Sequence, residues 1–408
     1  MKRYFFVLGS NFNLSLAELS ALFPHNRWEK CDSVVLSDFS EELDCRELMV
    51  LLGGTIKIGE VVKEISLANR RSLAESVKRE LILEAKKSGT GELSGKFNFG
   101  FSFYNKKNLA GDFFKLGLAV KKDLKNMGLA SRMVMSREPI LSSVVVEQNK
   151  LVKNGLELCF MVDKKTVYLG KTLVVQPFKD LSKRDFGRPN RDDHSGMIPP
   201  KLAQIMINLA RRNDKDYQDK ILADPFCGSG TILMEAYLMG FKNIIGTDLS
   251  DKAVVDSKKN MEWLFDFKNN SGKGNNINIF KSDILELDEK IDKNSVDYVV
   301  CEPYLGPQRG FKDFTEVVSD LDDLYSKSFE ILFDILKIGG RIVMVWPQFR
   351  AENKVWKINP KIGRFKFRAT LDLNIEDKKE LNKDRDTLVY GRAEQKVWRE
   401  IVILEKLK

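Results

Sequence analysis

The sequence predicts an α/β protein, with a doubly wound parallel sheet in its C-terminal half and smaller α+β modules before it. From residue 221 onward, short apolar segments alternate with segments of helical periodicity, which is the pattern of a parallel sheet. Before residue 175 the strand-like segments come in runs with fewer helices between them. A chain of 408 residues is longer than one typical domain, so two or three domains are expected.

Residues 1–65 form the first predicted module. The apolar periodicity predicts strands at 3–8, 34–36 and 56–65 and helices at 13–23 and 44–52. Ser15 and Glu18 have the spacing of a capping box, Pro24 ends the first helix, and Gly53 with Gly54 ends the second.

Residues 66–176 form the second predicted module. We expect helices at 72–87 and 114–127 and strands at 97–104, 132–135, 144–148, 156–162 and 166–175. The first of these strands alternates cleanly, with phenylalanine at every second position from Phe97 to Phe103. Such alternation favours a packed core over a platform for stacking bases.

Residues 177–200 lack regular periodicity and are predicted to be a linker. This segment is rich in arginines, among them Arg184, Arg188 and Arg191. Two interpretations remain open: a solvated connector, or a strip of arginines that contacts an RNA backbone.

Residues 201–408 form the predicted parallel-sheet domain. Its expected strands are 221–223, 243–246, 277–280, 296–300 and 341–345, followed by extended segments at 365–373, 387–391 and 397–405. Its expected helices are 231–239, 252–265 and 321–336.

The net charge of +9 is concentrated before this domain. Residues 1–200 contain 32 Lys and Arg against 24 Asp and Glu, whereas residues 201–408 contain 35 against 34. A basic region joined to a near-neutral one favours a polyanionic partner, usually nucleic acid. Lys121 and Lys122 on the helix at 114–127 are candidate RNA contacts. A generally basic proteome would produce the same excess.

The cysteine usage fits a reducing, cytoplasmic compartment, and we expect a monomer with no membrane partner. No apolar run reaches the roughly 18 residues that span a bilayer. The first residues suit a β-strand better than a signal peptide. The five cysteines contain no C-x-x-C pair and there are two histidines, so we expect no metal site and small, buried cysteines.

The stretch from Asp224 to Thr231, DPFCGSGT, carries the most specific signal. It follows a short apolar strand and precedes a helix, and Gly228 and Gly230 allow positive φ and close approach of a ligand. The third glycine of the dinucleotide fingerprint is absent, which argues against NAD or FAD. Asp248 and Asp283 stand at or just after the ends of the next two strands, so all three carboxylates are expected at one edge of the sheet.

This stretch resembles the cofactor loop of S-adenosylmethionine-dependent methyltransferases that act on exocyclic amino groups of bases. An acidic side chain after the second strand suits a ribose diol, because a carboxylate accepts two hydrogen bonds. By this interpretation Asp248 accepts from the ribose, Asp283 from the adenine amino group, and Asp224 faces the cationic amino-acid portion.

Cys301-Glu-Pro-Tyr304 resembles the Asp/Asn-Pro-Pro-Tyr/Phe signature of amino-methyltransferases. In that signature the acid or amide and a proline carbonyl accept the protons of the target amine, and the aromatic ring stacks on the base. The sequence departs from it by a glutamate and by the loss of one proline, so Cys301 is an alternative match for the acid. We assign the acceptor role to Glu302, with Pro303 and Tyr304 completing the catalytic loop.

Matching segments along nearly the whole chain resemble the THUMP-containing tRNA guanosine-10 N2-methyltransferase family. They include residues 1–23, 99–104, 168–170 with 175–176, 184–189 and 195–203. The resemblance implies a ferredoxin-like module at 1–65, a THUMP domain at 66–176 and a Rossmann-like methyltransferase domain at 201–408. It also implies that a segment around residues 195–203 closes over S-adenosylmethionine. The cofactor contacts that it implies are Met197, Asp224, Phe226, Cys227, Gly228, Gly230, Asp248, Leu249, Asp283 and Ile284.

Three functions are therefore considered. The first is methylation of the N2 amine of a guanosine in tRNA, with position 10 as the target. The second is an amino-methyltransferase of DNA, whose cofactor loop would look the same. The third is a tRNA-binding protein with an inactive methyltransferase half, a possibility raised by the altered loop at 301–304.

Overall fold

A computed structural model describes residues 1–89, 96–105, 110–191, 197–268, 274–307, 313–351, 354–369, 381–382, 384–392 and 394–407. The chain divides into two compact units. The first unit contains residues 1–12, 25–50 and 55–178, and the second contains residues 13–24, 51–54 and 179–408.

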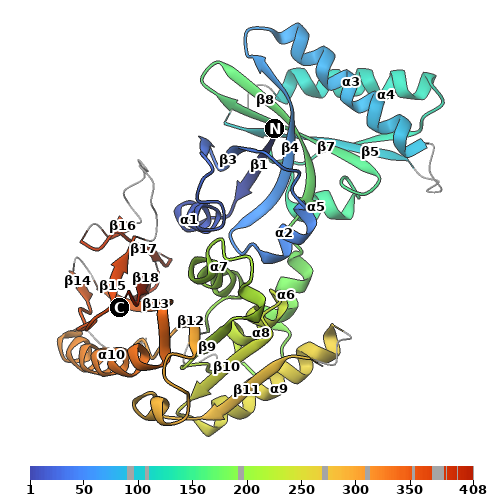
Figure 1. Cartoon of the computed structure of the whole chain (residues 1–408). Helices are drawn as coiled ribbons and strands as arrows, with labels where there is room; N and C mark the ends of the chain where they lie inside the picture. The colour runs from blue at the N-terminus through green and yellow to red at the C-terminus, as the bar shows by residue number, and fades with distance from the viewer. Residues whose placement is uncertain are drawn as a thin grey trace. The chain divides into compact units, whose positions relative to one another are not determined.

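The first unit is built on one eight-stranded sheet (Figure 1). Its strands, in chain order, are β1 (Lys2–Leu8), β2 (Glu29–Cys31), β3 (Val34–Phe39), β4 (Thr55–Ser66), β5 (Phe97–Tyr104), β6 (Ser131–Val134), β7 (Gly155–Asp163) and β8 (Thr166–Val175). Their spatial order is β2-β3-β1-β4-β8-β7-β5-β6. Because β4 pairs with both β1 and β8, the boundary predicted at residues 65 and 66 falls within a continuous sheet.

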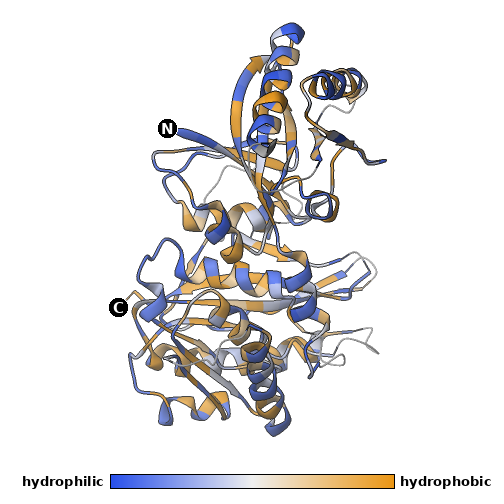
Figure 2. Ribbon diagram, turned by 90° about the vertical axis from the view of Figure 1, so that its right-hand side faces the viewer, coloured by the Kyte–Doolittle hydropathy of each residue, from blue (hydrophilic) through white to orange (hydrophobic). Residues whose placement is uncertain are grey.

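In the part of this unit that the structure describes, the sheet is accompanied by the helices α2 (Cys45–Leu51), α3 (Arg70–Gly89), α4 (Ala110–Asn126) and α5 (Ser143–Gln148). Helices α3 and α4 lie side by side over β5 and β7 (Figure 1), and the four alternating phenylalanines of β5 are buried beneath them. The prediction that this aromatic run is core is therefore confirmed. Figure 2 shows that hydrophobic residues are concentrated on the strands.

The prediction of a strand at 144–148 is wrong, because these residues form helix α5. Three consecutive valines suggested a strand. The side chain of Ser142 instead accepts a hydrogen bond from the backbone N–H of Val145 at 3.3 Å and caps a helix. The local cap and the burial of Val146 outweigh the β propensity of the valines.

The second unit contains a mixed sheet whose main path runs β11-β10-β9-β12-β13-β18-β17-β16, with β14 on β13 and β15 on β18. Its strands are β9 (Ile221–Asp224), β10 (Asn243–Asp248), β11 (Asn276–Lys281), β12 (Val296–Cys301), β13 (Leu336–Ala351), β14 (Lys354–Lys357), β15 (Lys366–Arg368), β16 (Leu381–Asn382), β17 (Thr387–Tyr390) and β18 (Val397–Glu405). Residues 370–373 of the predicted extended segment lie outside the described residues.

Strands β11, β10, β9, β12 and β13 are parallel, and β18 is antiparallel to β13. The helices of this unit are α1 (Phe12–Leu22), α6 (Phe178–Phe186), α7 (Pro200–Arg211), α8 (Thr231–Leu238), α9 (Asp251–Phe267) and α10 (Thr315–Ile335), with short 3-10 turns at η2 (Tyr217–Asp219) and η3 (Ile284–Glu289). The strand order reverses between β9 and β12, which is where doubly wound sheets bind ligands. The predicted class of fold is confirmed.

The predicted linker at 177–200 contains the helix α6, which the periodicity did not reveal. Helix α6 spans only the nine residues Phe178–Phe186, which leave room for few repeats of an apolar stripe.

Helix α1 belongs to the second unit from Asn13 onward, and the side chain of Glu18 is fully buried there. Its carboxylate accepts hydrogen bonds from the backbone N–H groups of Gly53 and Gly54, each at 2.9 Å, and from the side-chain amide of Asn208 at 2.7 Å. Burial raises the pKa of Glu18 to about 7, although these donors oppose the rise. Glu18 therefore contributes to the core, whereas its spacing from Ser15 suggested a helix cap.

None of the helices within the described ranges is both long and apolar enough to cross a membrane. All five cysteines are buried thiols, as expected.

Candidate active site

A pocket of about 500 Å³ opens at the carboxyl edge of the second sheet. This volume lies in the range of small-molecule and cofactor sites. The loops after β9, β10, β11 and β12 line it together with Met197 and Ile198. The four strands carry these loops to one edge because they are parallel and adjacent.

The loop after β9 is shaped by its two glycines. Gly228 has φ +51°, and a Cβ atom placed on it would meet nothing within 4 Å, so its backbone faces open space. Gly230 has φ +82° and begins helix α8. This bare backbone before a helix N-terminus allows a ligand to approach closely.

Asp248 stands at the end of β10 and connects two loops. One of its carboxylate oxygens accepts the N–H of Gly228 and the other accepts the N–H of Ser250, each at 2.9 Å. Each oxygen retains a second lone pair, so the carboxylate is held in one orientation and can still accept from a diol.

Asp224 ends β9 and is almost completely buried in the wall of the pocket. Burial raises its pKa well above the usual value, and the nearby carboxylates of Asp248 and Glu302 raise it further, although the N–H of Phe226 donates to it at 3.1 Å. A cation bound in the pocket would offset the cost of ionising this carboxyl group.

Asp283 follows β11 and caps η3, where its side chain accepts the N–H of Leu285 at 2.9 Å. Of the predicted cofactor contacts, the structure places nine in the lining of this pocket: Met197, Asp224, Phe226, Cys227, Gly228, Asp248, Leu249, Asp283 and Ile284. Gly230 is outside the lining and shapes the loop behind it. The segment at 195–203 is expected to close over S-adenosylmethionine. Its residues 195 and 196 lie outside the described residues.

The loop after β12 forms the other side of the pocket. Glu302, Pro303 and Tyr304 all line it, and Tyr304 is 61% exposed. The hydroxyl of Tyr325 on α10 donates to the carbonyl of Tyr304 at 3.0 Å and supports the loop. Cys301, the alternative match for the acid, is fully buried at the end of β12 and is not part of the lining.

The carboxylate of Glu302 has a partner that sequence reasoning missed. Arg399 on β18 donates to it from Nε at 2.5 Å and from Nη2 at 3.0 Å. Burial lowers the pKa of Arg399, but the contact with Glu302 outweighs burial and raises it. Arg399 is 97 positions away in sequence, within a segment predicted only to be extended, so no local signal marked it.

Two of the proposed RNA contacts are corrected by the structure. Arg184 is buried and forms a two-pronged ion pair with Glu235, at 2.6 and 3.0 Å. Arg188 is also buried, and its guanidinium donates to the hydroxyl of Thr231. Both arginines bind side chains of helix α8 inside the unit, so neither faces an RNA backbone. Arg191, Lys121 and Lys122 are exposed.

Comparisons with known proteins agree with this geometry. Residues 188–368 match the family model described as "RMKL-like, methyltransferase domain". A relative from Methanothermococcus thermolithotrophicus, named probable tRNA (guanine(10)-N2)-dimethyltransferase, is 31% identical over 137 residues, which cover 33% of this chain and 78% of the relative. The chain belongs to the tRNA (guanine(10)-N2)-dimethyltransferase family.

Longer members of this family match over about half their length. The tRNA (guanine(10)-N2)-dimethyltransferase of Pyrococcus abyssi is 28% identical over 199 residues, which cover 48% of this chain and 51% of the relative. The crystal structure of TrmN from Thermus thermophilus aligns with this chain over the full length of both, with a TM-score of 0.52 and 17% sequence identity. A likeness at this identity supports the fold alone. The predicted membership of the family is thus confirmed, whereas the assignment of a THUMP domain to residues 66–176 stays a prediction.

A second family model, described as "DNA methylase", matches residues 78–259. This match ends within α9 and does not reach the loop at 301–304. It therefore carries no information on the base that the loop would accept.

Proposed function

We propose that this protein methylates the exocyclic N2 amine of a guanosine in tRNA, at position 10, with S-adenosylmethionine as the donor. The observation that carries the proposal is the pairing, in one pocket, of the three strand-end aspartates with the loop of Glu302, Pro303 and Tyr304. The names of the related proteins supply the base and the position.

The residues of the pocket fit S-adenosylmethionine. Asp248 would hold the ribose hydroxyls, Asp283 the adenine amino group, and the buried Asp224 the cationic amino-acid portion. The open backbone at Gly228 leaves room for the ligand beside the helix N-terminus. When bound, S-adenosylmethionine supplies a methyl group activated by the positive sulfonium.

The loop after β12 would prepare the amine. The lone pair of an exocyclic base amine is delocalised into the ring, which makes the amine a poor nucleophile. Glu302 and the carbonyl of Pro303 would accept its two N–H groups and concentrate charge on nitrogen, and Tyr304 would stack on the base. As nitrogen gains a methyl group it loses one proton, which a carboxylate oxygen of Glu302 can accept.

We propose that the first unit holds the tRNA through phosphate contacts of the exposed Lys121 and Lys122 on α4, and that the exposed Arg191 of the second unit also contacts a phosphate. A paired base cannot reach the pocket, so the guanosine must be flipped or single-stranded. We further propose that the protein acts as a cytoplasmic monomer.

The test is transfer of labelled methyl from S-adenosylmethionine to unmodified tRNA, followed by nucleoside mass spectrometry. We expect N2-methylated guanosine in wild type and its loss in Asp248→Ala and Glu302→Ala. Methylated adenosine or cytidine, or a preference for duplex DNA over tRNA, would refute the assignment of the substrate. Binding of tRNA without binding of S-adenosylmethionine would instead support an inactive methyltransferase half.

A further inference from the structure

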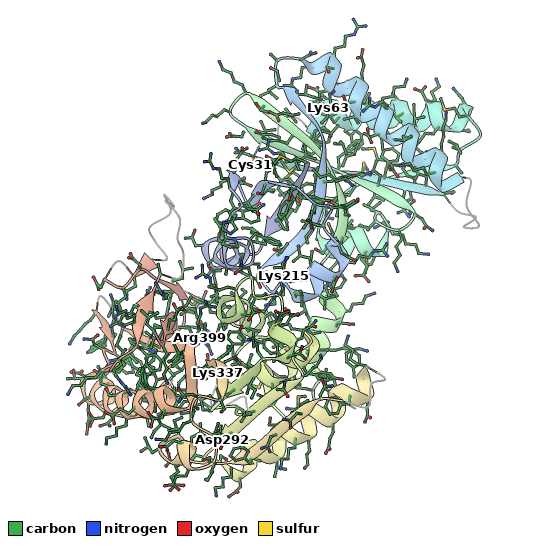
Figure 3. The ribbon with its side chains drawn as sticks, viewed as in Figure 1. Cys31, Lys63, Lys215, Asp292, Lys337 and Arg399 are labelled. Atoms are coloured by element: carbon green, nitrogen blue, oxygen red, sulfur yellow. The ribbon has the colours of Figure 1, made fainter. Side chains whose placement is uncertain are left out.

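The strongest unexplained feature of the site is the ion pair between Glu302 and Arg399 (Arg399 is labelled in Figure 3). Strand β18 runs antiparallel to β13, with Arg399 opposite Pro347, and β13 lies beside β12. This register brings the guanidinium to the loop that follows β12. Both side chains are 10% exposed, so the pair is largely shielded from water.

Arg399 supplies the positive charge beside the carboxylate of Glu302. Glu302 also interacts electrostatically with Asp224 at the end of β9, Cys301 at the end of β12 and Tyr325 on α10. Burial raises the pKa of the thiol of Cys301 and of the phenol of Tyr325, so both are neutral. Among the described residues, Arg399 is the cation that pairs with Glu302.

The pairing leaves Glu302 able to accept further hydrogen bonds. A carboxylate offers about four lone-pair sites. Nε of Arg399 uses one on Oε2, and Nη2 uses one on Oε1. One site remains on each oxygen, and Glu302 lines the pocket in which the amine would lie.

The ion pair also restricts a side chain that is longer than the family signature requires. Glutamate has one more rotatable bond than the aspartate of the Asp/Asn-Pro-Pro-Tyr/Phe signature, and so more freedom to lose on reaching one geometry. A two-pronged guanidinium contact fixes the plane of the carboxylate as well as its position.

We propose that Arg399 is a positioning residue, which holds the carboxylate of Glu302 in the one orientation that accepts the target amine. This inference rests on the proposed function. It assigns a role to a residue of β18 that lies outside every sequence motif of the site.

The test combines Arg399→Ala and Arg399→Lys with the tRNA methylation assay in the full chain. We expect Arg399→Ala to lower kcat by about 100-fold, because a misplaced acceptor has that cost, and to leave the Kd for S-adenosylmethionine nearly unchanged. Arg399→Lys keeps the positive charge but cannot make the two-pronged contact, so it should lower kcat less than Arg399→Ala does.

Added guanidinium ion should partly restore kcat in Arg399→Ala, because it can occupy the vacated space beside Glu302. Glu302→Gln combined with Arg399→Ala should be no slower than the slower single variant, because the two residues act as a unit. The matched control is Arg385→Ala, which removes an arginine that lies 3.6 Å from the buried Glu400 in the same unit. It should lower Tm without a comparable loss of kcat and without rescue by guanidinium.

The outcomes separate the two proposals. An active wild type in which Arg399→Ala loses activity without rescue by guanidinium, and Arg399→Lys loses as much, would overturn the positioning role and leave the proposed function standing. An active wild type with an unaffected Arg399→Ala would do the same. A wild type that binds tRNA and S-adenosylmethionine but transfers no methyl group would overturn the proposed function, and the role of Arg399 with it.

Discussion

At the scale of single residues, the site depends on charges that the fold buries. Asp224 has its pKa raised well above the usual value by burial and by the carboxylates of Asp248 and Glu302. A buried carboxyl group with a raised pKa costs stability once it ionises, and a protein can retain it where a cationic ligand offsets that cost. Here the cationic portion of S-adenosylmethionine is the proposed ligand.

Asp224→Asn should therefore raise the stability of the ligand-free protein at high pH. The folded-state pKa is above the unfolded value of about 3.9, so wild type loses stability as pH rises from that value through the folded pKa. Asparagine has no such loss and keeps an oxygen to accept the N–H of Phe226. We expect Tm of the variant to exceed that of wild type at pH 8, and the difference to shrink towards pH 4, in thermal unfolding monitored by circular dichroism.

The same variant should bind S-adenosylmethionine much more weakly, by isothermal titration calorimetry, because it lacks the anion. A Tm difference that does not depend on pH would contradict the raised pKa of Asp224.

At the scale of secondary-structure elements, the cofactor loop depends on close packing of α8 against α9. A Cβ atom on Gly230 would lie 2.4 Å from Oγ of Ser257 on α9, and φ at this position is +82°. Glycine is therefore required here for two reasons, its conformation and its lack of a side chain.

Gly230→Ala should lower stability more than Gly274→Ala, which is the matched control. Gly274 has nearly the same φ, +86°, but a Cβ atom there would meet nothing within 4 Å. We expect about 1–2 kcal/mol for the left-handed conformation in both variants, and an added loss in Gly230→Ala from the clash with Ser257. Equal shifts of the urea midpoint in the two variants would show that helix α9 moves away from the added methyl group with no loss of stability.

The ion pair of Arg184 and Glu235 holds α6 against α8. Glu235→Ala leaves a buried guanidinium without its anion, which should cost about 3–5 kcal/mol. Replacing both residues together, Arg184→Met with Glu235→Leu, should recover most of that loss, because an apolar pair of similar volume packs in its place. Urea unfolding measures the stability of the single and of the double variant. A double variant that is no more stable than Glu235→Ala would show that the two charges themselves are needed.

At the scale of the whole molecule, the charge is divided between a basic N-terminal half and a near-neutral C-terminal half. Nucleic-acid affinity depends on such charge through the release of counterions, and so it falls with salt. We propose that the first unit holds tRNA and that the second unit catalyses methyl transfer.

Lys121→Glu with Lys122→Glu should weaken binding of tRNA and reduce the slope of log K against log salt by about one for each phosphate that the variant no longer neutralises. The matched control is Lys258→Glu with Lys259→Glu, which makes the same change in net charge on exposed neighbours of α9 in the second unit. Fluorescence anisotropy over a series of salt concentrations measures both. Equal effects of the two double variants would show that net charge alone, and not the surface of α4, governs binding.

Much of the active site was predictable because its signals are local. The turn with Gly228 and Gly230 follows a strand within a few residues, and Asp248 and Asp283 stand at or just after strand ends. Parallel strands bring such positions to one edge whatever the details of packing, so the pocket followed from the order of strands and helices. Glu302 likewise reached the pocket because it directly follows β12.

What the sequence determined by itself was therefore the class of fold, the cofactor loop and the family. Only the tertiary structure decided which charges face solvent and which are paired inside. Arg184 and Arg188 stand in an arginine-rich segment that looked like a surface, yet their partners Glu235 and Thr231 lie 51 and 43 residues away. The partner of Glu302 lies 97 residues away, on a strand that carries no motif. Long-range pairing of charges depends on the register of the strands and on burial. The spacing of residues along the chain predicts neither of them.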